Sequence, residues 1–339
     1  MNLSKRNVLK TFTTLCLAAG VLMGYQYLGA ELYTRAEIWI TDQEAGAMRW
    51  LSWLFHSPWT DMFMQYLFLM GAAYLPIYLM ICWLPKDTQK SRKLSGKDFL
   101  VSTVMAMGLG YIFNLAGTFI NLLISNITGA SFMDMNPVAD LMESITPAMI
   151  IYTCVLGPFM EELLCRGFLL KRARVFGDWT AVVFTAVIFG MMHGNIAQFL
   201  YATVIGMILG YVAVKTNRIR YTVLIHVVIN TYNMALGWGE TLIWETGSDL
   251  LLAMYSLAVI LNMVVLMIGG VIAMVKYAKI WYKQMVYHNR PQLVWEKRIP
   301  DDAGETPEAP VRWQWVYLNP GFLIYILLCL IEFMHYLTA

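Results

Sequence analysis

Charged side chains are scarce in this sequence, and their scarcity decides the class of protein. Only 14% of the 339 residues are Asp, Glu, Lys or Arg, whereas hydrophobic residues make up 59%. A soluble domain typically carries about a quarter charged residues. The net charge is only +2, which argues against the strongly basic surface of a nucleic-acid binder. We therefore expect lipid to solvate most of the chain, and no nucleic acid among its partners.

Several sequence signatures are also missing. The five cysteines are scattered and form no C-x-x-C pair, which excludes a thiolate metal site and a disulfide framework as the basis of the fold. No series of ten-residue segments alternates apolar and polar residues, so a membrane β-barrel is excluded. Neither the H-E-x-x-H helix of zinc proteases nor the G-x-S-x-G elbow of serine hydrolases occurs.

Long apolar runs are what the sequence has instead. Most of them reach the roughly 20 residues that a helix needs to cross a bilayer. In lipid every backbone polar group must be satisfied internally, so helices are the expected element. The predicted fold class is an all-α polytopic membrane protein, a bundle of about eight to nine transmembrane helices. The runs lie at 8–29, 60–84, 98–125, 145–170, 179–193, 195–214, 221–238, 250–275 and 320–337.

Lysine and arginine gather in alternate loops between these runs. Residues 85–97 carry five of them, whereas residues 126–144 carry none. The positive-inside rule then places the N-terminus in the cytoplasm of a multi-pass cell-membrane protein. Residues 8–28 are interpreted as a retained first span, because the run is long for a signal peptide.

Five regions follow from this division of the chain. Residues 1–94 form an N-terminal membrane region with two spans and an outer loop, and residues 95–240 form a central membrane core. Residues 241–283 add a further span and residues 284–319 a soluble cytoplasmic segment. Residues 320–339 are predicted to form the final span.

Polar side chains lie inside three of the spans, where they are costly. A charged group near the bilayer centre costs about 2.5–3.5 kcal/mol on insertion scales. Glu161 and Glu162 lie in the fourth run, His193 ends the fifth, and the seventh contains His226 with Asn230 one turn later. Counted from the helix ends at about 1.5 Å per residue, these side chains can meet at one level.

The two glutamates are predicted to differ. Glu162 and Arg166 are four residues apart, so they share a helix face and can pair. Glu161 is rotated about 100° away and has no such partner, which makes it the better free base. Phe189 precedes His193 by one turn on the same face and is a candidate supporting residue.

Other polar residues in the runs are interpreted as structural. Glu332 and His335 form a single E-x-x-H near the end of the last run, and one such motif lacks the partner helices that a di-metal site needs. Asn114 and Asn121 lie one heptad apart, as expected for polar contacts between membrane helices.

Two chemistries remain open for the cluster. A buried glutamate can activate water without a metal, with asparagine donating to the oxyanion. One carboxylate and two histidines also match a catalytic zinc site, with Glu161, His193 and His226 as ligands if a zinc ion is used. Both chemistries hydrolyse a peptide bond.

Two functions other than proteolysis are compatible with such a cluster. One is a non-enzymatic membrane scaffold or a bacteriocin-immunity-type protein, which would keep the polar residues for helix packing. The other is a transporter with a proton relay, against which stands the absence of an inverted repeat.

Three motifs give the cluster a family resemblance. They are Glu161-Glu162-Leu163-Leu164-Cys165-Arg166 (E-E-x-x-x-R), Phe189-Gly190-Met191-Met192-His193 (F-x-x-x-H) and His226-Val227-Val228-Ile229-Asn230 (H-x-x-x-N). In this order, on successive helices, they resemble the CPBP family of CAAX proteases and bacteriocin-processing enzymes. That family includes type II CAAX prenyl endopeptidases and proteins called ABI or lysostaphin-resistance-like. The resemblance covers about residues 95–240.

The resemblance implies a glutamate-dependent intramembrane endopeptidase acting on membrane-associated peptides or proteins. It assigns water activation to Glu161, with Glu162 beside it, and a second catalytic role to His193. His226 and Asn230 correspond to the oxyanion-stabilising pair, and Arg166 to the structural arginine. Whether the substrate is prenylated does not follow from these residues.

Overall fold

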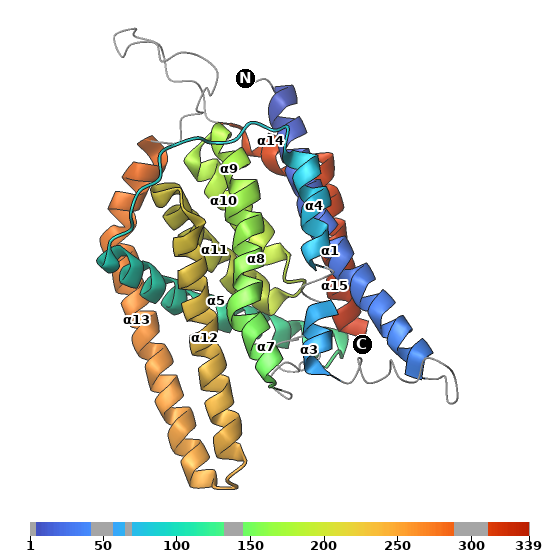
Figure 1. Cartoon of the computed structure of the whole chain (residues 1–339). Coiled ribbons are helices and arrows are strands. Elements are labelled where there is room, and N and C mark those ends of the chain that lie inside the picture. The colour runs from blue at the N-terminus through green and yellow to red at the C-terminus, as the bar shows by residue number, and fades with distance from the viewer. Residues whose placement is uncertain (1–4, 42–56, 65–69, 132–144, 288–310, 339) are drawn as a thin grey trace.

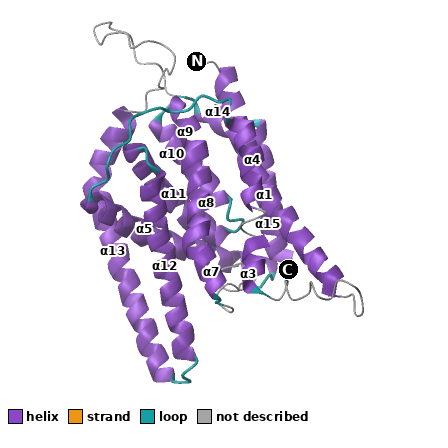
Figure 2. Cartoon of the chain, viewed as in Figure 1, coloured by secondary structure: helices purple, strands orange, loops and turns teal. Residues whose placement is uncertain are grey.

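The computed structural model describes residues 5–41, 57–64, 70–131, 145–287 and 311–338. Within these residues every regular element is a helix and no strand occurs (Figure 2), which confirms the all-α class. The elements are α1 (Lys5–Thr41), α3 (Pro58–Asp61), α4 (Met70–Ile81), α5 (Gly96–Thr128), α7 (Pro147–Ile151), η3 (Tyr152–Leu156), α8 (Gly157–Glu162), η4 (Leu163–Leu169), α9 (Leu170–Ala173), η5 (Arg174–Phe176), α10 (Asp178–Met191), α11 (Ile196–Thr216), α12 (Ile219–Trp244), α13 (Asp249–Tyr287), α14 (Trp313–Tyr317) and α15 (Pro320–Thr338).

The helices coincide with the apolar runs, although α1 and α13 each continue 12 residues (41 − 29 and 287 − 275) past the predicted ends of their runs at residues 29 and 275. Five of the described helical segments are long and apolar enough to cross a membrane: Lys5–Ile40, Gly96–Thr128, Pro147–Phe176, Ile196–Thr216 and Asp249–Ile280. Three shorter apolar helices are Gly71–Ile81, Asp178–Met191 and Pro320–Met334. The chain is therefore a polytopic membrane protein. Most of the predicted soluble segment, residues 288–310, lies outside the described part of the chain.

Helix α12 belongs to neither apolar group, although it is 26 residues long. His226, Asn230 and Asn233 all lie in its central turns and lower its mean hydropathy. Polar residues in a membrane helix face the bundle interior or a cavity more often than lipid. The helix that least resembles a span by composition is thus the one that carries two predicted site residues.

Helix α5 runs obliquely across the other long helices (Figure 1) and contacts both α11 and α13. Glycines allow these contacts. A Cβ atom added to Gly108 would lie 2.1 Å from the backbone oxygen of Leu266 in α13. A Cβ atom at Gly117 would lie 2.9 Å from the backbone oxygen of Ala197 in α11. Small residues allow membrane helices to approach backbone to backbone.

The α5–α13 contact gives a direct test of this packing. Gly108→Leu is expected to force the two helices apart and destabilise the protein by at least about 1–3 kcal/mol, the usual cost of overpacking. Thermal unfolding in detergent measures the loss. Gly96→Leu is the control on the same helix, because a Cβ atom there meets nothing within 4 Å. Equal melting temperatures for both variants would contradict the close contact.

Helices α1, α4 and α15 form a second group beside the core (Figure 1). Thr13 Oγ1 of α1 donates to Asn319 Oδ1 at 3.1 Å, just before α15 begins. The hydroxyl of Tyr325 in α15 donates to the backbone oxygen of Ile188 in α10 at 3.1 Å. This buried bond joins the last helix to the helix that precedes His193.

Residues 85–95, here called the strap, contain no helix and cross one end of the bundle (Figure 1). Arg174 anchors the strap, with its guanidinium 2.7 Å from Asp87 Oδ2 and 2.6 Å from Asp178 Oδ1. The backbone N–H of Asp87 also donates to the oxygen of Lys171 at 2.7 Å. These buried bonds tie the strap to the end of the helix that carries the two glutamates.

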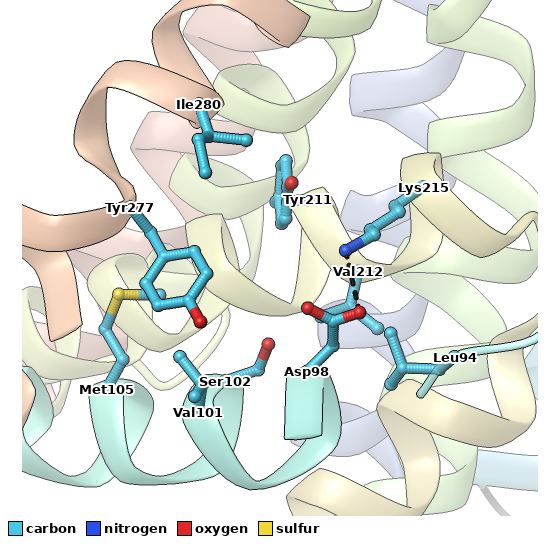
Figure 3. A pocket seen from close by; sticks show the side chains of 10 residues that line it. All are labelled: Leu94, Asp98, Val101, Ser102, Met105, Tyr211, Val212, Lys215, Tyr277 and Ile280. Atoms are coloured by element: carbon cyan, nitrogen blue, oxygen red, sulfur yellow. Dashed lines mark ion pairs between the residues drawn. The ribbon is translucent and has the colours of Figure 1, made fainter. Parts of the chain in front are cut away.

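A small pocket of about 140 Å³ lies where α5 begins, between α11 and α13 (Figure 3). Lys215 Nζ points toward Asp98 Oδ2 across it, at 3.1 Å. Asp98 also accepts a bond from Ser95 Oγ, and its backbone N–H donates back to that hydroxyl. This reciprocal cap fixes the start of α5, and the ion pair ties that start to the end of α11.

Candidate active site

The helix that carries Glu161 and Glu162 is interrupted by two π-helical segments. η3 (Tyr152–Leu156) precedes α8 and η4 (Leu163–Leu169) follows it. A π-helix is rare and occurs frequently at functional sites. Each segment shifts the hydrogen-bond pattern by one residue.

Pro158 leaves one backbone carbonyl of the first π-helical segment without its helical donor. The N–H of Gly157 donates to the oxygen of Tyr152, in the i to i−5 pattern. The next residue, Pro158, has no N–H, so it cannot continue that pattern to the oxygen of Thr153. Asn230 Nδ2 of α12 donates to this oxygen instead, at 2.9 Å. The freed carbonyl thus fixes the orientation of the Asn230 amide.

Glu162 is fully buried and paired. Arg166 Nη1 lies 2.6 Å from Glu162 Oε1, and neither side chain is exposed, which confirms the predicted pair. Arg166 Nη2 also donates to the oxygen of Gly206 at 2.9 Å. His226 Nδ1 lies 3.2 Å from the same Glu162 oxygen. Because a paired carboxylate only accepts, this bond assigns the Nδ1 proton to His226.

Phe189 separates the charge of Arg166 from the two histidines. The guanidinium carbon lies 4.7 Å from the ring centre. The rings of His193 and His226 meet Phe189 edge-on, with centroids 5.1 and 5.7 Å away. The predicted supporting residue therefore contacts three of the predicted site residues.

His193 lies in a tight turn between α10 and α11. Its Nδ1 is 2.8 Å from the oxygen of Phe189, a carbonyl that can only accept, so Nδ1 carries the proton. Gly194 follows with φ of +67°, and Asn195 caps α11 by accepting from the N–H of Gln198. Asn195 Nδ2 also donates back to the oxygen of His193. The turn therefore holds the imidazole in one tautomer and leaves Nε2 as an acceptor.

Glu332 of α15 packs against this turn. A Cβ atom added to Gly194 would lie 2.3 Å from the Glu332 carboxyl carbon. Glu332, which the sequence predicted to be structural, therefore lies against the turn that carries His193. The His335 side chain is outside the part that the structure describes.

A cavity of about 520 Å³ brings the predicted residues together. Glu161, His193, His226 and Asn230 all line it, together with Phe189. The Glu161 side chain is 21% exposed, and its Oε2 lies 3.7 Å from His226 Nε2. Glu162 has no exposed side-chain surface and does not line the cavity. The adjacent glutamates therefore differ as predicted. Glu161 lines the cavity, whereas Glu162 lies buried behind the cavity wall.

The zinc alternative requires three ligands around one point. In the part of the chain that the structure describes, no group of three or more His, Cys, Asp or Glu side chains is arranged to hold a metal ion. Glu161, His193 and His226 nevertheless line the same cavity, and the bond from His226 Nδ1 to Glu162 leaves Nε2 on the side of Glu161. Zinc binding by these three residues therefore stays a prediction.

Several polar residues on the cavity wall were not predicted as site residues. Tyr111 and Asn114 come from α5, Gln198 and Tyr201 from α11, and Asn233 from α12. Asn114 was interpreted as a packing contact. Asn233 follows His226 by seven residues, on the same helix face. That spacing is the sequence signal that could have identified it.

Comparisons with known proteins agree with the motifs. Residues 143–232 match the family described as type II CAAX prenyl endopeptidase Rce1-like. The chain is also 25% identical over 175 residues to the "Putative membrane peptidase YdiL" of Bacillus subtilis (strain 168). That alignment covers 48% of this chain and 66% of the relative, just under two thirds of its length. No solved structure matches the chain. Residues 143–232 contain all three motifs, so this match supports the resemblance to the CPBP family that those motifs indicate.

Proposed function

We propose that this chain is an intramembrane endopeptidase that hydrolyses membrane-associated peptides or proteins with water activated by Glu161. The observation that carries the proposal is the division of labour between the glutamates. Arg166 balances the charge of Glu162 behind the cavity wall, whereas Glu161 faces the cavity 3.7 Å from His226. A carboxylate that lines a cavity and is not paired with an arginine is suited to general-base catalysis.

The reaction uses one proton twice. Glu161 removes a proton from water, and the oxygen attacks the carbonyl carbon of the scissile amide. The tetrahedral intermediate then breaks its C–N bond, and Glu161 returns the proton to the leaving nitrogen. His193 Nε2, left as an acceptor by the Nδ1 bond to Phe189, helps to hold the water. The products are a free carboxylic acid and a free amine.

Asn230 donates to the oxyanion, and His226 joins it only through a protonated Nε2, because the bond to Glu162 already uses the Nδ1 proton. One N–H of the Asn230 amide is held by Thr153, which leaves the second for the substrate oxygen. Glu162 is a positioning residue, because its carboxylate accepts from His226 Nδ1 and directs the other ring nitrogen toward the cavity side. A preorganised donor of this kind contributes about 3–4 kcal/mol to the transition state.

The substrate comes from the bilayer. Cavities of about 300–1,000 Å³ bury most of a small ligand, and this one, at about 520 Å³, has room for a few peptide residues. Its wall contains apolar side chains between the polar ones, including Ile205, Ile229 and Met234. The N-terminus is proposed to lie in the cytoplasm, from the Lys and Arg loops.

Cleavage by the purified full-length protein tests the proposal. Lipid-anchored peptides of varied sequence are incubated with the protein in liposomes, and mass spectrometry maps any cleaved bond. We expect cleavage by wild type and a loss of about 100-fold or more in His193→Ala, in the range of general acid–base contributions. Thermal unfolding of the variant shows whether it is folded. No cleavage by wild type would favour the scaffold or immunity function.

A further inference from the structure

The cavity extends well beyond the proposed catalytic groups. On α12, one face presents His226, Asn230, Asn233 and Gly237 to it, at intervals of four, three and four residues. At about 1.5 Å per residue, Asn233 lies about 10 Å along the helix from His226. The opposite wall at that level is formed by α5, which contributes Tyr111 and Asn114.

Hydrogen bonds hold these three side chains in place. The hydroxyl of Tyr111, a buried residue, donates to Asn233 Oδ1 at 2.7 Å. Asn233 Nδ2 donates to the oxygen of Ile229 at 3.0 Å. Thr118 Oγ1 donates to Asn114 Oδ1 at 3.1 Å. The bonds occupy the amide oxygens and leave N–H donors, both of Asn114 and one of Asn233, without a partner among the described residues.

Packing alone does not account for this group. A polar pair that only joins two helices has no need of a cavity, and Tyr232 of α12 and Asn262 of α13 bond each other without lining it. Tyr111, Asn114 and Asn233 instead line an open cavity and retain unused donors. A ligand's polar group that leaves water to enter the cavity needs a hydrogen-bond partner to offset its desolvation. The unused donors therefore match a ligand that brings acceptors.

An extended peptide is such a ligand. It presents a carbonyl acceptor at every residue, about 3.3–3.6 Å apart along the chain. The distance of about 10 Å from His226 to Asn233 therefore corresponds to about three residues. Primary amides also bind carbonyl groups without regard to the side chains of the substrate.

We propose that Tyr111, Asn114 and Asn233, here called the amide subsite, bind the main chain of an extended peptide substrate about three residues from the cleaved bond. Asn114 and Asn233 donate to substrate carbonyls, and Tyr111 fixes the Asn233 amide for that purpose. The subsite rests on the proposed function and adds a requirement for substrate length. A peptide too short to reach the amide subsite does not bind more tightly because of it.

Substrate truncation combined with substitution tests the subsite. The probe is the lipid-anchored peptide that wild type cleaves fastest, remade with one to six residues on each side of the mapped bond. Asn114→Leu and Asn233→Leu are each expected to lower kcat/KM about tenfold for peptides that extend three or more residues on one side. The loss is expected mainly in KM, as for a binding contact. Peptides cut to one residue on that side are cleaved equally by wild type and variants.

Tyr232→Phe is the matched control. It removes a Tyr–Asn bond from the same helix, one residue before Asn233, and neither partner lines the cavity. Its kcat/KM should equal that of wild type at every peptide length. Equal losses on long and short peptides, or no loss in the Asn variants, would overturn the subsite while leaving the protease in place. No cleavage by wild type would overturn the proposed function and the subsite with it.

Discussion

Glu161→Gln is expected to lower kcat by about 10²–10⁴-fold while leaving the protein folded. Glutamine keeps the shape of the side chain and removes its basicity, and general-base catalysis contributes about that factor. Glu161 is partly exposed on the cavity wall and makes no ion pair with Arg166, so the substitution leaves little buried charge uncompensated. Turnover of a cleaved peptide gives kcat, and thermal unfolding gives the stability.

Glu162→Gln is the matched control, one residue along the same helix. Here the loss of charge leaves Arg166 buried without its partner, so the melting temperature is expected to fall. Glu161→Gln should therefore lose mainly kcat, whereas Glu162→Gln should lose mainly stability, because the glutamine oxygen can still accept from His226 Nδ1. A Glu161→Gln enzyme with full kcat would contradict the assignment of the base.

Arg166→Leu is expected to be among the most destabilising substitutions in the chain. Removal of one partner from a buried pair costs about 3–5 kcal/mol, because the other charge remains uncompensated in the interior. The Gly206 carbonyl would lose its donor as well, and Phe189 its cation. Whole domains are stable by only about 5–15 kcal/mol. Chemical or thermal unfolding in detergent measures the loss.

The double variant Glu162→Leu/Arg166→Leu distinguishes charge from packing. It removes both charges and keeps apolar volume, so it should be more stable than Arg166→Leu alone. It is nevertheless expected to be inactive, because His226 Nδ1 loses its acceptor. If the double variant is less stable than Arg166→Leu, the ion pair with Glu162 is not the main way in which Arg166 stabilises the protein.

The sequence was sufficient to predict the class of fold and the difference between the glutamates. Apolar runs have few alternatives in lipid, so their positions matched the helices. The pairing of Glu162 with Arg166 depends only on a separation of four residues, which a helix turns into a contact. Phe189 and His193 could be placed on one face for the same reason.

Features that depend on distant contacts could not be predicted. A π-helix leaves no simple spacing pattern, so the release of the Thr153 carbonyl beside Pro158 was not foreseen. Asn114 has a spacing that suits helix packing equally well, and only the path of α5 across the bundle places it on the cavity wall. The contact between Glu332 and Gly194 joins segments 138 positions apart (332 − 194).

The α12–α13 hairpin extends beyond the other helices (Figure 1), and its length couples the cavity to the bilayer. α13 has 39 residues, or about 58 Å at 1.5 Å per residue, against a hydrocarbon core of about 30 Å. Hydrophobic mismatch of this kind is relieved by tilt. Tyr255 of α13 bonds Leu236 of α12, so the two helices tilt together. Because this hairpin carries His226 and Asn230 whereas Glu161 lies on another helix, we expect membrane thickness to change the distance between Glu161 and the other two side chains.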